Sequence, residues 1–346
     1  MTPSFRNSLF VAVMAAALAS PAAMAFADPA PAYTVVKAVP LGAPDRWDYV
    51  VYDAPSHRVY VAHADRVTVV DGRDGTVIGE VTGIPGGTHG IGISNATGQG
   101  FTDDGRNGQA IVFDLKTLAI KARIPVQPDA DAIAFDPKSG NVFVIEGDPQ
   151  KISVIDPKTD TVIATIDAGG KLEYGAADGR GSIYVAGVAS KDVVRVDTRT
   201  NTVTAHWPIA DCLLPHGLAV DAKGRRVFVS CENQKLVVVD ADNGREIGSA
   251  PIGKGTDAAG YDPSHKRAFS TNGMDGTLSV IAPTGPDAYA TIATVTTAVS
   301  GRTMSVDPET GRVFIAAADV DPSPTPGGRP KARPGTLKLL FLDPAR

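Results

Sequence analysis

A short apolar segment that ends at or near an aspartate or asparagine recurs seven times along the chain. The seven anchor positions are separated by 41 to 45 residues. A period of this length is typical of the blades of a β-propeller, and few other folds repeat in this way. The anchors are Asp53, Asn95, Asp136, Asp178, Asp221, Asp262 and Asp307.

Each repeat follows the same order of segments. Turn residues come after the anchor, as at 137–140, and a strand rich in β-branched and aromatic residues follows, as at 226–230. A third strand ends in aspartate, as at 236–240, and a polar hairpin leads into a fourth. Alternating apolar residues with turn punctuation predict strands, and no stretch shows sustained helical periodicity. The sequence therefore predicts an all-β fold: a seven-bladed propeller with four antiparallel strands in each blade.

The two ends of the repeat array predict how the ring closes. Blade seven begins near Arg302, and its third strand, at 336–342, nearly ends the chain. A strand at 33–40 precedes blade one and has no blade of its own. Pairing it with the C-terminal strands would complete blade seven and remove two open sheet edges. Residues 28–346 are therefore expected to form one propeller domain, with an open solenoid as the alternative.

A proline-rich insertion at 321–334 separates the second and third strands of blade seven. Its prolines predict an extended segment with few hydrogen bonds. Two interpretations remain open: a solvated surface loop, or a lid or partner-binding arm at the mouth of the channel.

Residues 1–27 have the pattern of a secretory signal peptide. Arg6 is the only charged residue before Asp28, the apolar run covers 9–19, and small residues follow. That run is short of the roughly 20 residues that span a bilayer, so cleavage is favoured over an uncleaved membrane anchor. No later segment is apolar enough to span a membrane. We expect a periplasmic or secreted protein.

Three second-strand segments carry a resemblance to a known family. Residues 60–63 read Tyr-Val-Ala-His, 183–186 read Ile-Tyr-Val-Ala, and 227–230 read Val-Phe-Val-Ser, each with a downstream V-x-V-x-D strand. The mature chain resembles the YncE-like YVTN-repeat propellers, which are exported bacterial proteins. The resemblance implies a seven-bladed propeller. It implies function only loosely, because the family and its structural relatives include DNA binders, surface-layer modules, lactonase-like enzymes and subunits of redox enzymes.

The innermost strand of each blade is expected to start at one face of the ring. The residue five positions before each anchor should therefore lie at the channel mouth. Six of these seven positions are ionisable in a chain of which 21% is charged, and this enrichment predicts a polar ligand site. The ring residues are Asp48, Gly90, Asp131, Glu173, His216, Asp257 and Arg302, with His89 beside Gly90.

Carboxylates beside imidazoles suit either a divalent metal or acid–base chemistry. Asp131, Glu173 and Asp257 are the candidate metal ligands, for Ca²⁺ or Zn²⁺, and no other cofactor is indicated. Alternatively, the ring is a solvated channel entrance in which Arg302 serves as the counter-ion of Asp257 or Asp48.

The loops after the second strands are expected to reach the same face. His63, taken alone, is expected to be a surface residue. These loops add His63, Asp103, Asp104, Arg106, Glu146, Glu232, Asn233 and Asn272.

The chain has two cysteines, which fall near one end of the first hairpin of blade five. Cys212 precedes the first strand and Cys231 ends the second. In an exported protein this placement predicts a disulfide, which would pin the loop that carries His216. Free thiols and soft-metal ligands are the alternatives.

The sequence holds no C-x-x-C-H, G-x-S-x-G or P-loop motif. This favours a non-catalytic binding or scaffold protein, expected to be monomeric, with a small molecule or a protein as ligand at the channel mouth. A metal-dependent hydrolase of the lactonase kind is the alternative. DNA binding rests on the family alone, and a net charge of −5 with dispersed Lys and Arg argues against nucleic acid.

Overall fold

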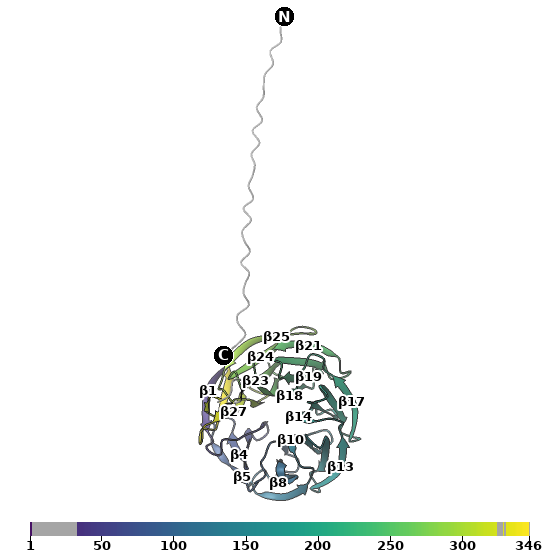
Figure 1. Ribbon diagram of the computed structural model, residues 1–346, viewed down its shortest axis with the longest axis vertical. Helices are drawn as coiled ribbons and strands as arrows, with labels where there is room; N and C mark the ends of the chain where they lie inside the picture. Colours follow the sequence, from purple (N-terminus) through teal and green to yellow (C-terminus); the bar gives the residue numbers. More distant parts are fainter. Residues whose placement is uncertain (2–32, 324–327, 329, 346) are drawn as a thin grey trace.

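Seven four-stranded antiparallel sheets stand side by side around a central axis (Figure 1). The computed structural model describes Met1 and residues 33–323, 328 and 330–345. Apart from Met1, the expected signal segment 1–27 lies outside the described residues. The predicted seven-bladed propeller is confirmed. In the described part of the chain the one helix is a three-residue 3₁₀ turn, η1 (Gly105–Asn107), and no helix is long and apolar enough to cross a membrane.

The first three blades use consecutive strands in the order of the sequence. Their strands are β2 (Val50–Asp53), β3 (Arg58–His63), β4 (Arg66–Asp71) and β5 (Val77–Thr82); β6 (Ile91–Ser94), β7 (Gln99–Asp104), β8 (Gln109–Asp114) and β9 (Ile120–Pro125); and β10 (Ala130–Phe135), β11 (Val142–Glu146), β12 (Lys151–Asp156) and β13 (Thr161–Asp167).

Blades four to six repeat this arrangement. Their strands are β14 (Leu172–Ala177), β15 (Ser182–Gly187), β16 (Asp192–Asp197) and β17 (Thr202–Pro208); β18 (Pro215–Asp221), β19 (Arg226–Cys231), β20 (Lys235–Asp240) and β21 (Glu246–Pro251); and β22 (Thr256–Asp262), β23 (Arg267–Asn272), β24 (Thr277–Gly285) and β25 (Ala288–Thr296).

Blade seven joins the two ends of the chain. It contains β26 (Thr303–Val306), β27 (Val313–Ala317), β30 (Lys338–Pro344) and β1 (Tyr33–Pro40), with β1 as the outer strand. β1 pairs antiparallel with β30 from Tyr33 opposite Pro344 to Pro40 opposite Lys338. The predicted closure is therefore confirmed. β30 begins two residues later than expected, because the backbone N–H groups of residues 335–337 donate to the Asp45 carboxylate instead of entering the ladder.

The recurring aspartate has a local structural role. The carboxylate of Asp136 accepts hydrogen bonds from the backbone N–H groups of Lys138 and Ser139, the two and three residues that follow. Such side-chain turns reverse the chain between the first and second strands of a blade. The first strands of neighbouring blades contact one another, and β26 contacts β2. These strands therefore line the central channel, while the apolar faces of the sheets pack between blades.

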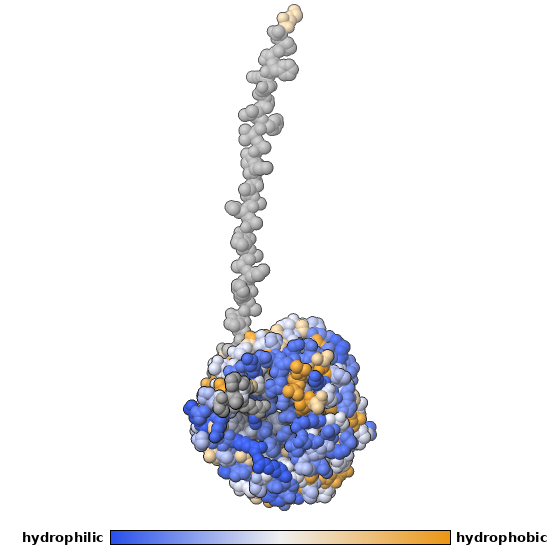
Figure 2. Space-filling model, in the orientation of Figure 1, coloured by the Kyte–Doolittle hydropathy of each residue, from blue (hydrophilic) through white to orange (hydrophobic). Residues whose placement is uncertain are grey.

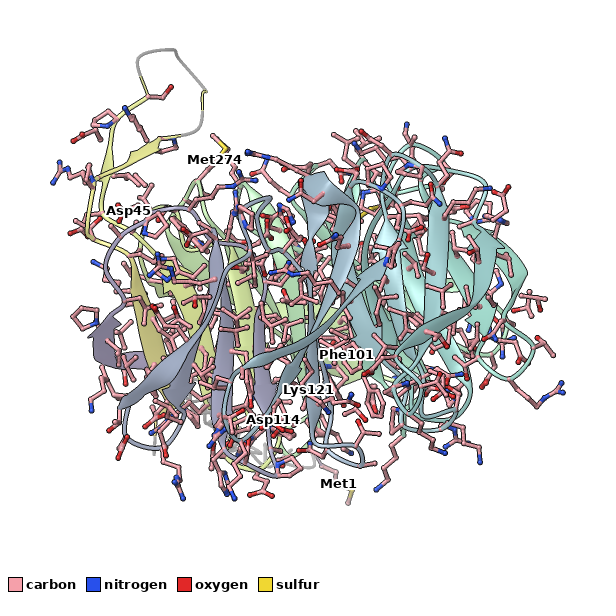
Figure 3. All side chains as sticks on the ribbon, turned by 90° about the horizontal axis from the view of Figure 1, so that it is seen from below. Met1, Asp45, Phe101, Asp114, Lys121 and Met274 are labelled. Carbon is pink, nitrogen blue, oxygen red and sulfur yellow. A yellow bond between two sulfur atoms is a disulfide. The ribbon has the colours of Figure 1, made fainter. Side chains whose placement is uncertain are left out.

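The insertion in blade seven is more ordered than expected at its base. β28 (Val320–Asp321) pairs with β29 (Lys331–Ala332) in a short hairpin, and Arg333 forms an ion pair with Asp321 at 2.7 Å. Residues 324–327 and 329 lie outside the described residues. Figure 3 shows the hairpin, in yellow, rising from the face that also carries Asp45 and Met274, whereas Asp114 lies on the opposite face. We call the first of these the mouth face.

Cys212 and Cys231 are joined by a disulfide, with their Cα atoms 5.4 Å apart. Cys231 lies opposite Pro215 in the β18–β19 ladder, so the bond fixes the loop directly before His216. Replacing both cysteines by alanine is expected to lower the free energy of unfolding by about 3 kcal/mol on a chain-entropy estimate for a loop of 19 residues. Chemical denaturation of the variant and of the oxidised wild type measures this loss. Equal midpoints would show that the bond carries no stability.

Candidate functional site

The ring residues converge at the mouth of the channel. They come from the starts of the inner strands or the loops just before them, and their side chains are only 12% to 28% exposed where they form ion pairs. Figure 2 shows the mouth face around them as predominantly hydrophilic. Gly90 is the exception in the ring: a Cβ there would lie 2.3 Å from the backbone nitrogen of Ile133. Blade two therefore contributes His89 in its place.

One group of potential ligands consists of Asp48, His89 and Asp131, with one ligand atom from each within 4.8 Å of the others. Behind it lies Asp103, fully buried, whose carboxylate is 2.7 Å from His89 Nδ1. Burial disfavours the imidazolium, but the hydrogen bond and charge of Asp103 raise the pKa of His89 to about 9. Arg46 Nη2 lies 3.3 Å from His89 Nε2. Asp103 thus holds Nδ1 of His89, whereas Nε2 faces the N–H donors of Arg46 and makes no hydrogen bond with them while the imidazole is protonated.

The second group consists of Glu173, His216 and Asp257, again within 4.8 Å of one another. His216 Nδ1 lies 3.6 Å from Glu173 Oε1 and 3.7 Å from Asp257 Oδ1. These are beyond hydrogen-bond distance, and His216 Nδ1 is buried without a hydrogen-bond partner. On the other side of the imidazole, His216 Nε2 lies 3.8 Å from Glu232 Oε1. A buried nitrogen that lies between two carboxylates and makes no hydrogen bond is an unsatisfied polar position in the ring.

Arg302 is the permanently charged cation of the ring. Its Nε lies 2.9 Å from Asp257 Oδ2, and its Nη2 lies 3.8 Å from Asp48 Oδ2. The same Nη2 donates to the Trp47 carbonyl at 3.0 Å, and the guanidinium lies over the Trp47 indole at 5.8 Å. Arg302 is therefore placed as a counter-ion, as one of the two interpretations of the sequence had it.

The three carboxylates expected to hold a metal are divided between the two groups. Asp131 belongs with Asp48 and His89, whereas Glu173 and Asp257 surround His216. The expected metal set of Asp131, Glu173 and Asp257 stays a prediction. In the structure Asp131 lies near the imidazole of His89, whereas Glu173 and Asp257 lie near the imidazole of His216.

The electrostatics of the ring favour the binding of a cation. Burial raises the pKa of Asp48 to about 7, although Arg302 lowers it. Burial, followed by the charges of Glu173 and Asp48, holds the pKa of Asp131 well above its usual range. The ring therefore resists carrying all its negative charges at once, and a bound cation would relieve that repulsion.

Replacing Asp131 by asparagine is expected to stabilise the metal-free protein. Because the folded state raises the pKa of Asp131, the wild type loses stability as pH rises from about 4 through that raised pKa. Asparagine does not titrate, so the gain should be small at pH 4.5 and should reach about 2 °C or more in Tm at pH 8. Thermal unfolding at both pH values, in the presence of a chelator, measures it. A gain that does not grow with pH would contradict the raised pKa.

Residues beyond the ring have mixed roles. Asp103 and Glu232, from the ends of second strands, reach the two histidines as the loop pattern suggested, whereas Arg46 was not anticipated. His63 is fully buried, not at the surface as expected: its Nδ1 contacts Thr68 Oγ1 at 2.9 Å and its Nε2 contacts the Pro44 carbonyl at 2.6 Å. An imidazole held at both nitrogens is a packing element.

Known proteins resemble the chain in sequence and in fold. No protein-family model matches it. It is 25% identical over 195 residues to the uncharacterized protein YncE of Salmonella typhi, a match that covers 51% of this chain and 54% of the relative. YncE of Salmonella typhimurium matches equally. The chain therefore resembles YncE over about half of its length. The match spans about half the length of these curated relatives.

Solved structures share the propeller fold of this chain. A chain of Kuenenia stuttgartiensis hydrazine synthase superimposes with a TM-score of 0.69 at 14% identity, covering 79% of this chain and 93% of that one. A chain of a mitotic checkpoint complex gives a TM-score of 0.75 at 14% identity, covering 98% and 100%. At this identity the likeness establishes the propeller architecture and nothing about activity.

Proposed function

We propose that this YncE-like propeller is an exported binding protein whose channel mouth holds a divalent cation together with a small polar ligand. The observation that carries the proposal is the Glu173–His216–Asp257 group. Its imidazole Nδ1 is buried, has no hydrogen-bond partner and lies within 4 Å of two carboxylates.

The donor atoms favour Zn²⁺ over Ca²⁺. Calcium sites in proteins are built from oxygen ligands, whereas zinc accepts imidazole nitrogen and carboxylate oxygen together. Three protein ligands would leave one position of a tetrahedral zinc for a ligand or water. The proton on His216 must leave when a metal binds, because burial is outweighed by Glu173, Asp257 and Glu232, which raise the pKa of His216.

Export and a monomeric state are parts of the same proposal. The pattern of residues 1–27 and the Cys212–Cys231 disulfide both support a periplasmic or extracellular location. β1 completes blade seven, so closing the ring does not require a strand from a second copy of the chain. Clustered carboxylates at the mouth, and few clustered cations, argue against nucleic acid as the ligand.

A metal-dependent hydrolase is the second candidate, and the Asp103–His89 pair favours it. A histidine that donates Nδ1–H to a buried carboxylate is a common way to orient a zinc ligand. With a metal bound, the neighbouring Asp48 and Asp131 could act on a metal-activated water. Assays of the zinc-loaded protein against a panel of simple lactones and esters separate the candidates, because a binding protein gives no turnover above free zinc.

Elemental analysis tests the proposal. Protein dialysed against excess Zn²⁺ and then against metal-free buffer is expected to retain about one zinc per chain. Retention of less than about a tenth of an equivalent would rule out a tight zinc site at the mouth.

A further inference from the structure

A pocket opens on the mouth face directly beside the ring. Its cavity volume is about 90 Å³, which is room for one compact group of a ligand that reaches in from the open side. The base of the blade-seven hairpin forms one wall, and Met274, which Figure 3 shows on the same face as the hairpin, also lines the pocket. The residues that matter for recognition are Trp47, Met274, Arg302, Val320, Pro330 and Ala332.

Among the described residues that line this pocket, Arg302 is the one charged side chain. Its Nε and Nη2 are held by Asp257, by Asp48 and by the Trp47 carbonyl, so the part of the guanidinium that these groups leave uncovered is the part that a ligand can reach. A guanidinium presents donors in a planar fork that suits a carboxylate. The rest of the wall is apolar and includes the indole of Trp47, against which a flat or branched group can pack.

Asp257 connects the pocket to the candidate cation site. One of its oxygens lies 2.9 Å from Arg302 Nε, and the other lies 3.7 Å from His216 Nδ1. A cation bound between Glu173, His216 and Asp257 would draw negative charge away from Arg302. Arg302 would then have more of its charge available for an anion in the pocket. Binding of a cation and of an anion at neighbouring positions is therefore expected to be mutually favourable.

We propose that the pocket binds a small organic carboxylate with a compact aromatic or branched apolar group, and that it binds cooperatively with the cation. This inference rests on the proposed function. The carboxylate pairs with Arg302 and the apolar group packs against Trp47 and the hairpin residues Val320 and Ala332.

Three probes with the same ring and different charge test this class: phenylacetate, phenethylamine and 2-phenylethanol. The chain has two tryptophans, so the Trp207→Phe variant leaves Trp47 as the one fluorescent reporter in the pocket. Titrating each probe with and without saturating Zn²⁺ gives its Kd. Phenylacetate is expected to bind at least fivefold more tightly with zinc, and at least tenfold more tightly than either of the other two probes when zinc is present.

Two variants on the hairpin provide the structural control. Ala332→Phe fills the pocket and is expected to weaken phenylacetate binding at least tenfold while leaving zinc binding unchanged. Lys331→Phe places the same ring on the neighbouring exposed residue, which does not line the pocket, and is expected to leave phenylacetate binding unchanged.

The outcomes separate this inference from the proposed function. If zinc binds but phenylacetate does not, or binds equally with and without zinc, the inference is overturned and the cation site stands. Preference for phenethylamine overturns the assignment of a carboxylate. If neither zinc nor phenylacetate binds, both the inference and the proposed function fail.

Discussion

A chain that begins at Leu41, and so lacks β1, is expected to lose cooperative folding or to aggregate at room temperature. β1 pairs with β30 along its whole length, and Tyr33 and Val39 are buried against neighbouring strands. Lys37 Nζ also donates to the Asp74 carbonyl of blade one. Removing these contacts exposes the β30 edge, and the loss of a strand of paired backbone and two buried side chains is on the order of 5 kcal/mol or more.

The matched control is a chain that begins at Tyr33 and keeps all of β1. Thermal unfolding followed by circular dichroism, with light scattering on the same samples, compares the two. The control should melt in one transition. If the shorter chain melts at the same temperature, β1 does not close the ring in solution.

The second large effect is expected from the double substitution Glu173→Gln with Asp257→Asn. It removes two of the three proposed ligands of the cation site and should weaken zinc binding at least 100-fold. The fold should survive, because both side chains lie at the channel entrance, where they are 17% and 12% exposed and carry little apolar packing. Asp257→Asn removes the closest carboxylate of Arg302, but the loss is offset by relief of repulsion within the ring. Competition with a chromogenic zinc chelator measures the affinity.

A control with the same change in charge is available on the opposite face. Asp242 and Glu246 lie at the outer hairpin of blade five, away from the mouth. The double variant Asp242→Asn with Glu246→Gln should bind zinc as the wild type does. Equal binding by the Glu173–Asp257 variant would place the zinc elsewhere on the protein.

The fold could be predicted almost entirely from the sequence, because each blade repeats one local solution. Anchors such as Asp136 close the first turn of a blade, and this requirement fixes a period that can be read without a structure. The strand at 33–40 could be placed because it was the one strand without a blade. The start of β30 was misplaced by two residues because Asp45, almost 300 residues away, captures the backbone before it.

The ring of residues at the mouth was also predictable, since a fixed offset from the anchor brings each position to the same face. Their pairing was not. Whether Asp131 faces His89 or Glu173 depends on the curvature of the ring and on side-chain rotamers, and the spacing of residues in the sequence reports neither of them. The pocket depends on a hairpin inside a proline-rich insertion, where period and composition predicted only an extended segment. His63 was misjudged because its hydrogen bonds reach a carbonyl 19 residues earlier.

Isothermal titration of Zn²⁺ into metal-stripped wild-type protein at pH 7.5 tests the central claim most directly, which is that Glu173, His216 and Asp257 hold a divalent cation at the channel mouth. We expect saturable binding of one zinc per chain with a Kd in the micromolar range or tighter. Binding should release protons, because zinc displaces the proton of His216. The absence of saturable heat in buffers of different ionisation enthalpy would contradict it, and the ring would then be a solvated channel entrance neutralised by Arg302.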